Sequence, residues 1–264
     1  PRSTLFPYTT LFRSKETFDS IGVKMIISSP RVIDLSFDKA KTMEFVASLG
    51  LRTPKTFQSL ADAKKAIQQK ELSFPLVIKP RWGSASIGIE FPMNEEELEL
   101  SYSLIILKIK RSILARASST DMEHSILIQE KINGKEFGLD VLNDFNGNTR
   151  AVYVKEKLAM RAGETDKAVL VDLPEVEKIG TTIGSHLKHV GNLDCDVMEM
   201  EGRYYFIEMN PRFGGGYPFT YMSGGNFPAI LLQWLENKDA IDPFLVKHYN
   251  SAFSKCDQLI KIKV

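Results

Sequence analysis

Two periods run through the apolar and polar positions of this chain, and together they predict both helices and strands. Apolar residues recur at near-helical spacing behind a polar cap or a proline, which predicts helices over residues 36–49, from 59, from 94, 174–191 and from 226. Short apolar or alternating runs predict strands over residues 21–29, 74–80, 89–91, 125–132, 136–142, 151–158, 193–200 and 204–209. Because these elements do not follow a regular strand–helix–strand alternation, we expect an α+β arrangement.

Residues 1–14 stand outside this pattern. They read PRSTLFPYTTLFRS, which has neither the continuous apolar core nor the small-residue cleavage site of a signal peptide. They match one reading frame of a common sequencing adapter, so we interpret them as an assembly artefact and expect the natural protein to begin upstream of Lys15. A genuine N-terminal strand is the alternative. The rest of the chain is long enough for one large domain or two smaller ones.

Charge, cysteine content and hydropathy narrow the class of protein. Without Arg2 and Arg13 the basic residues fall from 34 to 32 against 33 acids, so the net charge changes from +1 to −1, which argues against a nucleic-acid partner. Cys195 and Cys256 form neither a CxxC pair nor a disulfide framework, which suits a reducing, cytoplasmic location. No apolar run approaches the roughly 20 residues of a membrane span, so we expect no membrane partner.

The sharpest chemical pattern is YYFIEMNPR, residues 204–212. Side chains alternate along a strand, so Glu208 and Asn210 point to the same face and offer one charged and one neutral oxygen. A carboxylate buried beside Ile207 and Met209 costs several kcal/mol unless a cation compensates it. Oxygen ligands of this kind suit Mg²⁺. A half-exposed hairpin with ordinary surface acids is the alternative.

Asp196, on the preceding strand, is the third candidate ligand, and the length of the hairpin loop decides whether it joins the other two. A two-residue loop would place Asp196 opposite Ile207, facing away from Glu208. A three-residue loop would shift the pairing by one residue and bring Asp196 to the face of Glu208. If this is a metal site, we therefore predict a three-residue loop with Gly202 in or beside it.

Two further patterns are weaker on their own. Lys79 ends a predicted strand and precedes RWGSASIG, a loop whose backbone N–H groups can surround phosphates, although its spacing fits neither a P-loop nor a dinucleotide fingerprint. In QEKINGKE, residues 129–136, a strand that reaches Glu130 and Ile132 can offer an apolar wall to a base, and Glu136 could accept ribose hydroxyls. Solvated turns are the alternative for both.

In this order along the chain, the patterns resemble the ATP-grasp superfamily, and within it the branch of the carbamoyl phosphate synthase large subunit. The resemblance runs from about residue 38 to about residue 235, and EMNPR is its most specific element. It implies an ATP-grasp fold of two α+β lobes that hold ATP between them. We expect a remnant of a Rossmann-like pre-ATP-grasp domain, an N-terminal lobe, a C-terminal lobe and a tail over residues 15–36, 37–132, 133–240 and 241–264.

The resemblance also implies roles for individual residues. ATP is expected to contact two basic residues, the glycine- and serine-rich loop, the linker between the lobes and one carboxylate: Lys39, Lys79, Gly83, Ser84, Ser86, Gly88, Glu130, Ile132 and Glu136. Mg²⁺, or Mn²⁺ in its place, is expected on Asp196, Glu208 and Asn210. The linker between Glu130 and Glu136 is one residue shorter than in carbamoyl phosphate synthase.

The acceptor side is expected to use two loops. Arg161 begins RAGETD in the family's acceptor-side loop, and Arg212 ends the metal strand, so the two guanidinium groups could clamp developing charge. The triple glycine around Gly215 would let backbone N–H groups approach a transferring phosphoryl group or a carboxylate. A flexible hairpin tip and a plain loop are the alternatives.

The function implied by the resemblance is an ATP-dependent ligase. The terminal phosphoryl group would pass to a small-molecule carboxylate, and an amine or ammonia would attack the acyl phosphate. Bicarbonate activation, as in carbamoyl phosphate synthase or biotin carboxylase, phosphotransfer without ligation, and a truncated ATP-binding fragment are the alternatives. The four histidines are scattered, and Cys195 is interpreted as a packed core thiol. The oligomeric state and the acceptors stay open.

Overall fold

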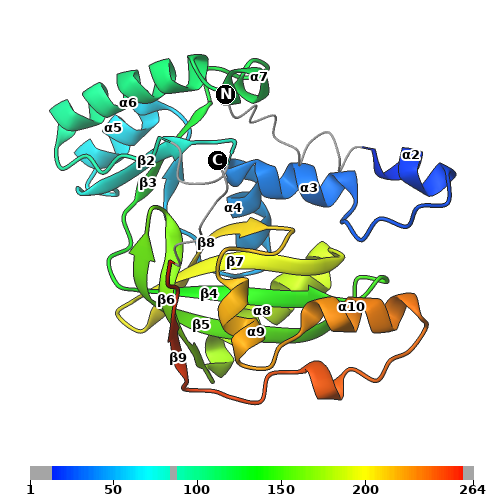
Figure 1. Ribbon diagram of the computed structural model, residues 1–264. Helices are drawn as coiled ribbons and strands as arrows, with labels where there is room; N and C mark the ends of the chain where they lie inside the picture. The colour runs from blue at the N-terminus through cyan, green and yellow to red at the C-terminus, as the bar shows by residue number, and fades with distance from the viewer. Residues whose placement is uncertain (1–13, 84–87, 258–264) are drawn as a thin grey trace, which may run out of the picture.

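The chain folds around two antiparallel sheets that lie one above the other in Figure 1. The computed structural model describes residues 14–83 and 88–257. The small sheet has three strands, in the order β1 (Thr56–Phe57), β3 (Ile126–Glu130) and β2 (Leu76–Pro80). The large sheet has six, in the order β8 (Arg203–Asn210), β7 (Gly191–Met200), β4 (Lys135–Asn143), β5 (Thr149–Arg161), β6 (Glu164–Val171) and β9 (Ala252–Ser254).

The small sheet forms one lobe with three helices. They are α5 (Leu60–Gln68), α6 (Glu95–Lys110) and α7 (Leu114–Ser118). Ser59 caps α5 and Asn94 caps α6, each accepting a hydrogen bond from a backbone N–H of the first turn, as predicted. Apolar residues of these helices, such as Leu98 and Ile105, pack with Ile78 and Ile128 of the strands into one core. The chain just after β2 bonds to the rest of the molecule, because the backbone N–H of Lys39 donates to the carbonyl of Arg81.

The large sheet has an apolar face and a charged face. Helices α3 (Pro30–Phe37), α4 (Lys39–Ser48) and α8 (Pro174–Leu187) contribute to the core on the apolar face. Helices α9 (Tyr217–Met222) and α10 (Phe227–Leu235) lie on the other face and pack with β5 and β6 (Figure 1). Helices around two separate antiparallel sheets confirm the predicted α+β class. No helix of the described residues combines the length and the apolar run that crossing a bilayer requires.

Several predicted boundaries are wrong. Residues 21–29 form no strand; they follow helix α2 (Lys15–Ser20), and the hydroxyl of Ser28 bonds to the backbone of Val190 instead. Ser36 lies inside α3, and Asp38 caps the next helix because its carboxylate accepts two backbone N–H groups and favours the positive helix end. Residues 89–91 make a single bridge to β2 rather than a strand.

The C-terminal part of the chain holds more structure than its pattern predicts. Helix α8 ends at Leu187, the next residue, Lys188, is left-handed, and Gly191 starts β7 rather than closing the helix. The segment after α10 forms a short 3-10 helix, η1 (Asp242–Phe244), and then adds β9 to β6. The lobe boundaries that we predict at residues 37, 133 and 241 stay predictions.

Candidate functional site

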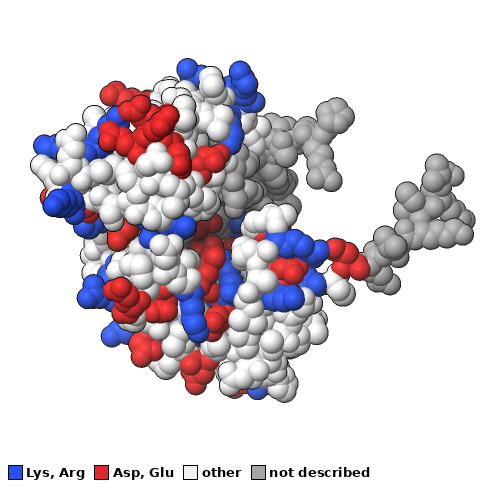
Figure 2. Space-filling view, turned by 90° about the vertical axis from the view of Figure 1, so that its left-hand side faces the viewer, with Lys and Arg blue, Asp and Glu red and all other residues white. Residues whose placement is uncertain are grey.

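The charged face of the large sheet is built by the two-residue period of its strands. Charged and amide side chains share this face on four neighbouring strands: Glu136 and Asp140 on β4, Lys155 and Lys157 on β5, Asp194 and Asp196 on β7, and Glu208 and Asn210 on β8. The alternate positions, such as Leu139 and Val197, point into the core behind the sheet. Figure 2 shows acidic side chains gathered in the hollow between the two lobes, with basic side chains beside them.

The β7–β8 hairpin places Asp196 directly opposite Glu208, but not through the loop that we predicted. The loop has only two residues, Glu201 and Gly202, with φ values of 54° and 72° that suit a tight hairpin turn. A β-bulge at Ile207 then shifts the register by one residue. The predicted three-residue loop is therefore wrong, because the extra residue lies within the strand rather than in the turn.

The three predicted metal ligands lie together. Asp196 and Glu208 are cross-strand partners, and Asn210 follows two residues later on the same face. Burial raises the pKa of Asp196 to about 7 against the effect of Lys157, and the charges of Asp194 and Glu208 raise it further. A divalent cation would relieve this crowding, and two carboxylates with an amide oxygen are donors that Mg²⁺ accepts. No group of three or more His, Cys, Asp or Glu in residues 14–83 and 88–257 is placed to hold a metal, so this mixed set stays a prediction.

Two lysines lie close enough to Glu208 to change its pKa. Lys39 is the first residue of α4, and Lys79, near the end of β2, is only 5% exposed. Burial lowers the pKa of Lys79 to about 8, with Glu208 acting in the opposite direction. Burial opposes ionisation of Glu208, but the charges of Lys39, Lys79, Lys157 and Arg212 together outweigh burial and lower the pKa of that carboxyl. Two predicted phosphate-binding lysines thus converge on a predicted metal ligand.

Helix α4 is tied to the chain that follows Lys79. Arg81 forms a bidentate pair with Asp38, with Nε–Oδ1 and Nη2–Oδ2 distances of 2.7 Å. The backbone N–H of Lys39 donates to the carbonyl of Arg81 at 3.1 Å, and Lys39 Nζ donates to the carbonyl of Gly83. These bonds hold Lys39 beside the start of the predicted phosphate loop. The sequence did not suggest that Arg81 has this positioning role.

The other predicted nucleotide contacts lie in the loop and between the lobes. Ser84 and Ser86 lie outside the described residues, and Gly88 follows them with a φ of 73°. Glu130 ends β3, where its carboxylate accepts the backbone N–H of Lys55 at 3.3 Å. Ile132, which is 6% exposed, lies in the segment that joins the two sheets. This position is where an apolar wall for a base was predicted.

Lys157 links the predicted ribose contact to the predicted metal site. Its Nζ lies 2.7 Å from Glu136 Oε1 and 2.6 Å from Asp196 Oδ1, and its side chain is 8% exposed. Burial opposes its charge, but these two carboxylates outweigh burial and raise the pKa of Lys157. The structure therefore places Lys157 among the candidate site residues.

Arg212 and Gly215 extend this site toward α9. Arg212 Nη1 lies 3.2 Å from Asp194 Oδ2. A Cβ added to Gly214 would lie 2.1 Å from Asp194 Cγ, so only glycine lets the backbone lie against that carboxylate. A Cβ added to Gly215 would lie 3.3 Å from Oε2 of Glu164, the first residue of β6, so the tip of the β5–β6 hairpin lies beside the glycine loop.

Arg161 lies at the tip of the β5–β6 hairpin. Its Nε lies 2.8 Å from Asp166 Oδ1, and its Nη1 forms an ion pair with Asp257, a residue beyond β9. The side chain is 49% exposed. The structure therefore brings Arg212 to the metal strand but engages Arg161 with two aspartates of its own hairpin and of the C-terminal segment.

Sequence reasoning misses three charged residues of this face: Asp140, Lys155 and Asp194. The signal that could have found them is their spacing. Asp140 stands four residues from Glu136 and Asp194 two residues from Asp196, so the strand period places each on the side of an assigned residue, and Lys155 stands two residues from Lys157.

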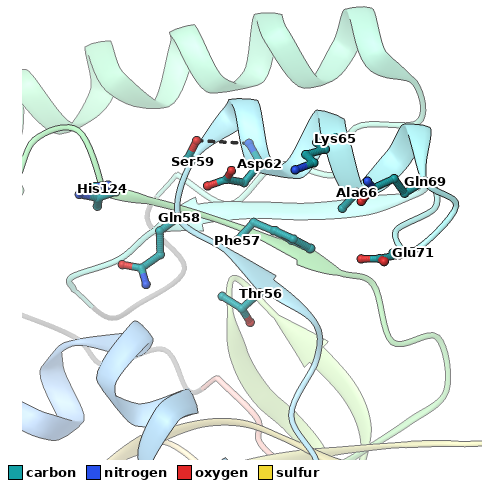
Figure 3. Close-up of a pocket in the computed structure, with 10 residues that line it drawn as sticks. All are labelled: Thr56, Phe57, Gln58, Ser59, Asp62, Lys65, Ala66, Gln69, Glu71 and His124. Atoms are coloured by element: carbon teal, nitrogen blue, oxygen red, sulfur yellow. Dashed lines mark hydrogen bonds between the residues drawn. The ribbon is translucent and has the colours of Figure 1, made fainter.

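A separate groove of about 640 Å³ crosses the small lobe (Figure 3). It runs between β1 and α5, with Phe57 on its floor and Asp62, Lys65 and Glu71 among its lining residues. None of the described residues predicted for the site lines it. The converging lysines and carboxylates of the large sheet, rather than this open groove, form the candidate functional site.

Comparison with known proteins gives a family match and relatives. The model of the ATP-grasp domain family matches residues 72–220, more than half of the chain. The small subunit of 2-oxoglutarate carboxylase from Hydrogenobacter thermophilus is 27% identical over 215 residues, which cover 77% of this chain and 44% of the relative. The large chain of carbamoyl phosphate synthase from Clostridium beijerinckii is 24% identical over 206 residues, which cover 73% of this chain and 18% of the relative. The chain thus spans less than half the length of both relatives.

A solved structure with a similar fold is the biotin carboxylase domain of the Hydrogenobacter thermophilus 2-oxoglutarate carboxylase, determined as a dimer with MgADP, ADP and bicarbonate. The TM-score is 0.72 at 20% sequence identity, and the match covers 91% of this chain and 54% of that chain. This likeness shows the fold.

Proposed function

The chain belongs to the ATP-grasp family, as its motifs had predicted, and on this premise we propose that it is an ATP- and Mg²⁺-dependent ligase that joins a carboxylate to an amine or ammonia. The observation that carries this proposal is the convergence of Lys39 and Lys79, from two different elements, on Glu208, opposite Asp196. A cluster of lysines against paired carboxylates is suited to hold phosphates and a divalent cation between them.

The nucleotide would lie between the two sheets. Lys39 and Lys79 would neutralise its phosphates. Glu130 and Ile132, on the segment between the lobes, would border the base, and Glu136 would accept ribose hydroxyls. Lys157, whose Nζ pairs with Glu136 in this structure, would lie between the ribose and the phosphates.

Asp196, Glu208 and Asn210 would hold Mg²⁺ through oxygen atoms only. The ion would supply charge neutralisation and orientation of the phosphate oxygens. The crowded carboxylates of Asp196 and Glu208, facing one another across the hairpin, fit that group.

The chemistry would proceed in two steps. A carboxylate oxygen attacks the terminal phosphorus of ATP, the bond to the bridging oxygen breaks, and ADP leaves. The amine nitrogen then attacks the acyl carbon, phosphate leaves and the nitrogen loses a proton. Arg212 and the backbone N–H of Gly215 would stabilise the charge of the transferring group, and Arg161, from the neighbouring hairpin, would complete the acceptor wall.

Bicarbonate activation is the second candidate. The two named relatives are a carboxylase subunit and a carbamoyl phosphate synthase chain, and the solved structure contains bicarbonate. In that case bicarbonate would take the place of the organic carboxylate, and carboxyphosphate would replace the acyl phosphate.

The test is acceptor-dependent release of ADP, with hydroxylamine present to trap acyl phosphates as hydroxamates. A panel of carboxylates is compared with bicarbonate, each with ammonia or an amine. Glu208→Gln should lower turnover by orders of magnitude with the fold intact, whereas Glu177→Gln, an exposed carboxylate on α8, should not. Near-normal turnover in Glu208→Gln would defeat the proposal, and release that responds to bicarbonate alone would favour the second candidate.

A further inference from the structure

An ion pair that the proposed reaction does not use lies beneath the acceptor end of the charged face. Lys155 Nζ on β5 pairs with Asp140 Oδ2 on β4, and the two side chains are 1% and 0% exposed. Replacing such a pair by apolar residues of similar size is often neutral for stability. The free energy of the ion pair itself therefore does not account for its presence, whereas the neighbouring groups that it holds in place can.

The pair is bonded to the helix that follows the glycine loop. The hydroxyl of Thr220, on α9, donates to Asp140 Oδ2 at 2.5 Å and accepts from Lys155 Nζ at 3.3 Å. One hydroxyl can do both because it has one donor and two acceptor sites. A Cβ added to Gly216, the residue before α9, would lie 3.3 Å from Lys155 Cε, so the loop backbone packs on the lysine stem.

The pair is also bonded to the start of the same loop. Asn192 Nδ2, on β7, donates to Asp140 Oδ1 at 3.1 Å and lies 3.4 Å from the carbonyl oxygen of Arg212. Asn192 is 3% exposed and Thr220 is 0% exposed, so both links are shielded from water. The buried pair thus reaches residues 212–216 at both of their ends.

We propose that Asp140 and Lys155 form a positioning unit that fixes residues 212–216, and with them the guanidinium of Arg212 and the backbone of Gly215, toward the reacting groups. Neither residue of the pair touches the open site; both act through Thr220 and Asn192. The role of Arg212 and Gly215 toward the reacting groups rests on the proposed function, whereas the ordering of residues 212–216 by the buried pair does not.

The first test separates the loop from general stability by two substitutions, one at Thr220 on α9 and one at Ser223 directly after this helix. Thr220→Val keeps the shape of the side chain but removes its bonds to the pair. Ser223→Ala is the matched control, because Ser223 is also 0% exposed and its hydroxyl donates only to the carbonyl of Phe219, one turn earlier, among the bonds described. Hydrogen exchange is measured by mass spectrometry on peptides that span residues 212–217.

Thr220→Val should speed exchange of that segment by about tenfold or more, and Ser223→Ala should leave it near the wild-type rate. Equal rates in the two variants would overturn the proposal. Exchange is read without nucleotide, so this result stands whether or not the protein binds ATP; absence of ATP binding in the wild type would count against the proposed function only.

The second test uses the charge-balanced double variant Asp140→Asn with Lys155→Met, which leaves no unpaired buried charge. It should unfold close to the wild-type temperature, bind MgATP with an unchanged Kd, and lower kcat by about 100-fold, because a small misplacement of the loop affects the reacting geometry. A kcat and an exchange rate that both match the wild type would contradict a positioning role, as would losses that follow the unfolding temperature alone.

Discussion

Replacing Lys79 by methionine removes a buried charge near Glu208 while keeping an unbranched side chain of similar length. The lysine is 5% exposed, so its bond to a phosphate would form largely away from water. A hydrogen bond from a charged group contributes about 1.5–3 kcal/mol, which corresponds to about 10–100-fold in Kd. We therefore expect Lys79→Met to weaken MgATP binding by that factor. The unfolding temperature should be unchanged or higher, because a buried charge disappears.

The pH dependence of the same interaction gives an independent check. Burial lowers the pKa of Lys79 to about 8, partly offset by Glu208. Between pH 7 and pH 9 the protonated fraction then falls from about nine-tenths to about one-tenth. If only the protonated amine holds the phosphates, Kd for MgATP rises about tenfold over this interval.

The assay is calorimetric titration of a non-hydrolysable ATP analogue at pH 7, 8 and 9. Wild type is compared with Lys79→Arg, which stays protonated throughout and should lose most of the pH dependence. Lys65→Arg, on the exposed side of α5, is the matched control and should keep it. A slope of the same size in Lys79→Arg, or a flat wild-type profile, would refute the assignment of Lys79 as a phosphate contact.

Two further predictions concern stability. Burial lowers the pKa of His189 from 6.5 to about 4 in the folded protein, so the unfolded chain takes up the proton at higher pH. The free energy of unfolding should therefore fall by about 3 kcal/mol as the pH drops from about 6.5 to 4. Denaturant unfolding at several pH values should show a smaller acid loss in His189→Gln than in His186→Gln, which alters an exposed histidine on α8; equal losses would exclude His189 as the cause. Gly214→Ala should destabilise the protein by about 1–3 kcal/mol, because the new Cβ would lie 2.1 Å from Asp194 Cγ. Gly215→Ala, which meets only the end of the exposed Glu164 side chain, should cost less, and the reverse order in denaturant unfolding would contradict the packing of the loop.

Local signals predicted the elements that carry their own caps or strong periodicity. Ser59 and Asn94 start their helices as expected, and Pro174 occupies the first turn of α8. The strand signal over residues 21–29 failed because an apolar run is not enough for a strand; it also needs a neighbouring strand to pair with. Strand β9 could not be foreseen, because it is defined by pairing with β6, about 85 residues earlier.

The sequence predicted the residues of the candidate site more fully than it predicted how these residues lie relative to one another. The face shared by Glu208 and Asn210 follows from the strand period alone. The partnership of Asp196 with Glu208 depends on a bulge at Ile207, which no residue of the strand announces. The bond of Arg81 to Asp38 joins elements 43 residues apart, so spacing rules that act within one element do not reach it. Motif order predicted which residues form the candidate site, whereas the polar contacts among them depend on the folded chain.

The central claim is that the charged face binds ATP together with Mg²⁺. Its most direct test is calorimetric titration of a non-hydrolysable ATP analogue, with and without Mg²⁺, into wild type, Asn210→Ala and the control Asn146→Ala, which alters an exposed turn after β4. Binding should depend on Mg²⁺ in the wild type and in Asn146→Ala, and it should weaken in Asn210→Ala. Binding that ignores Mg²⁺, or that is equal in the two variants, would contradict the account.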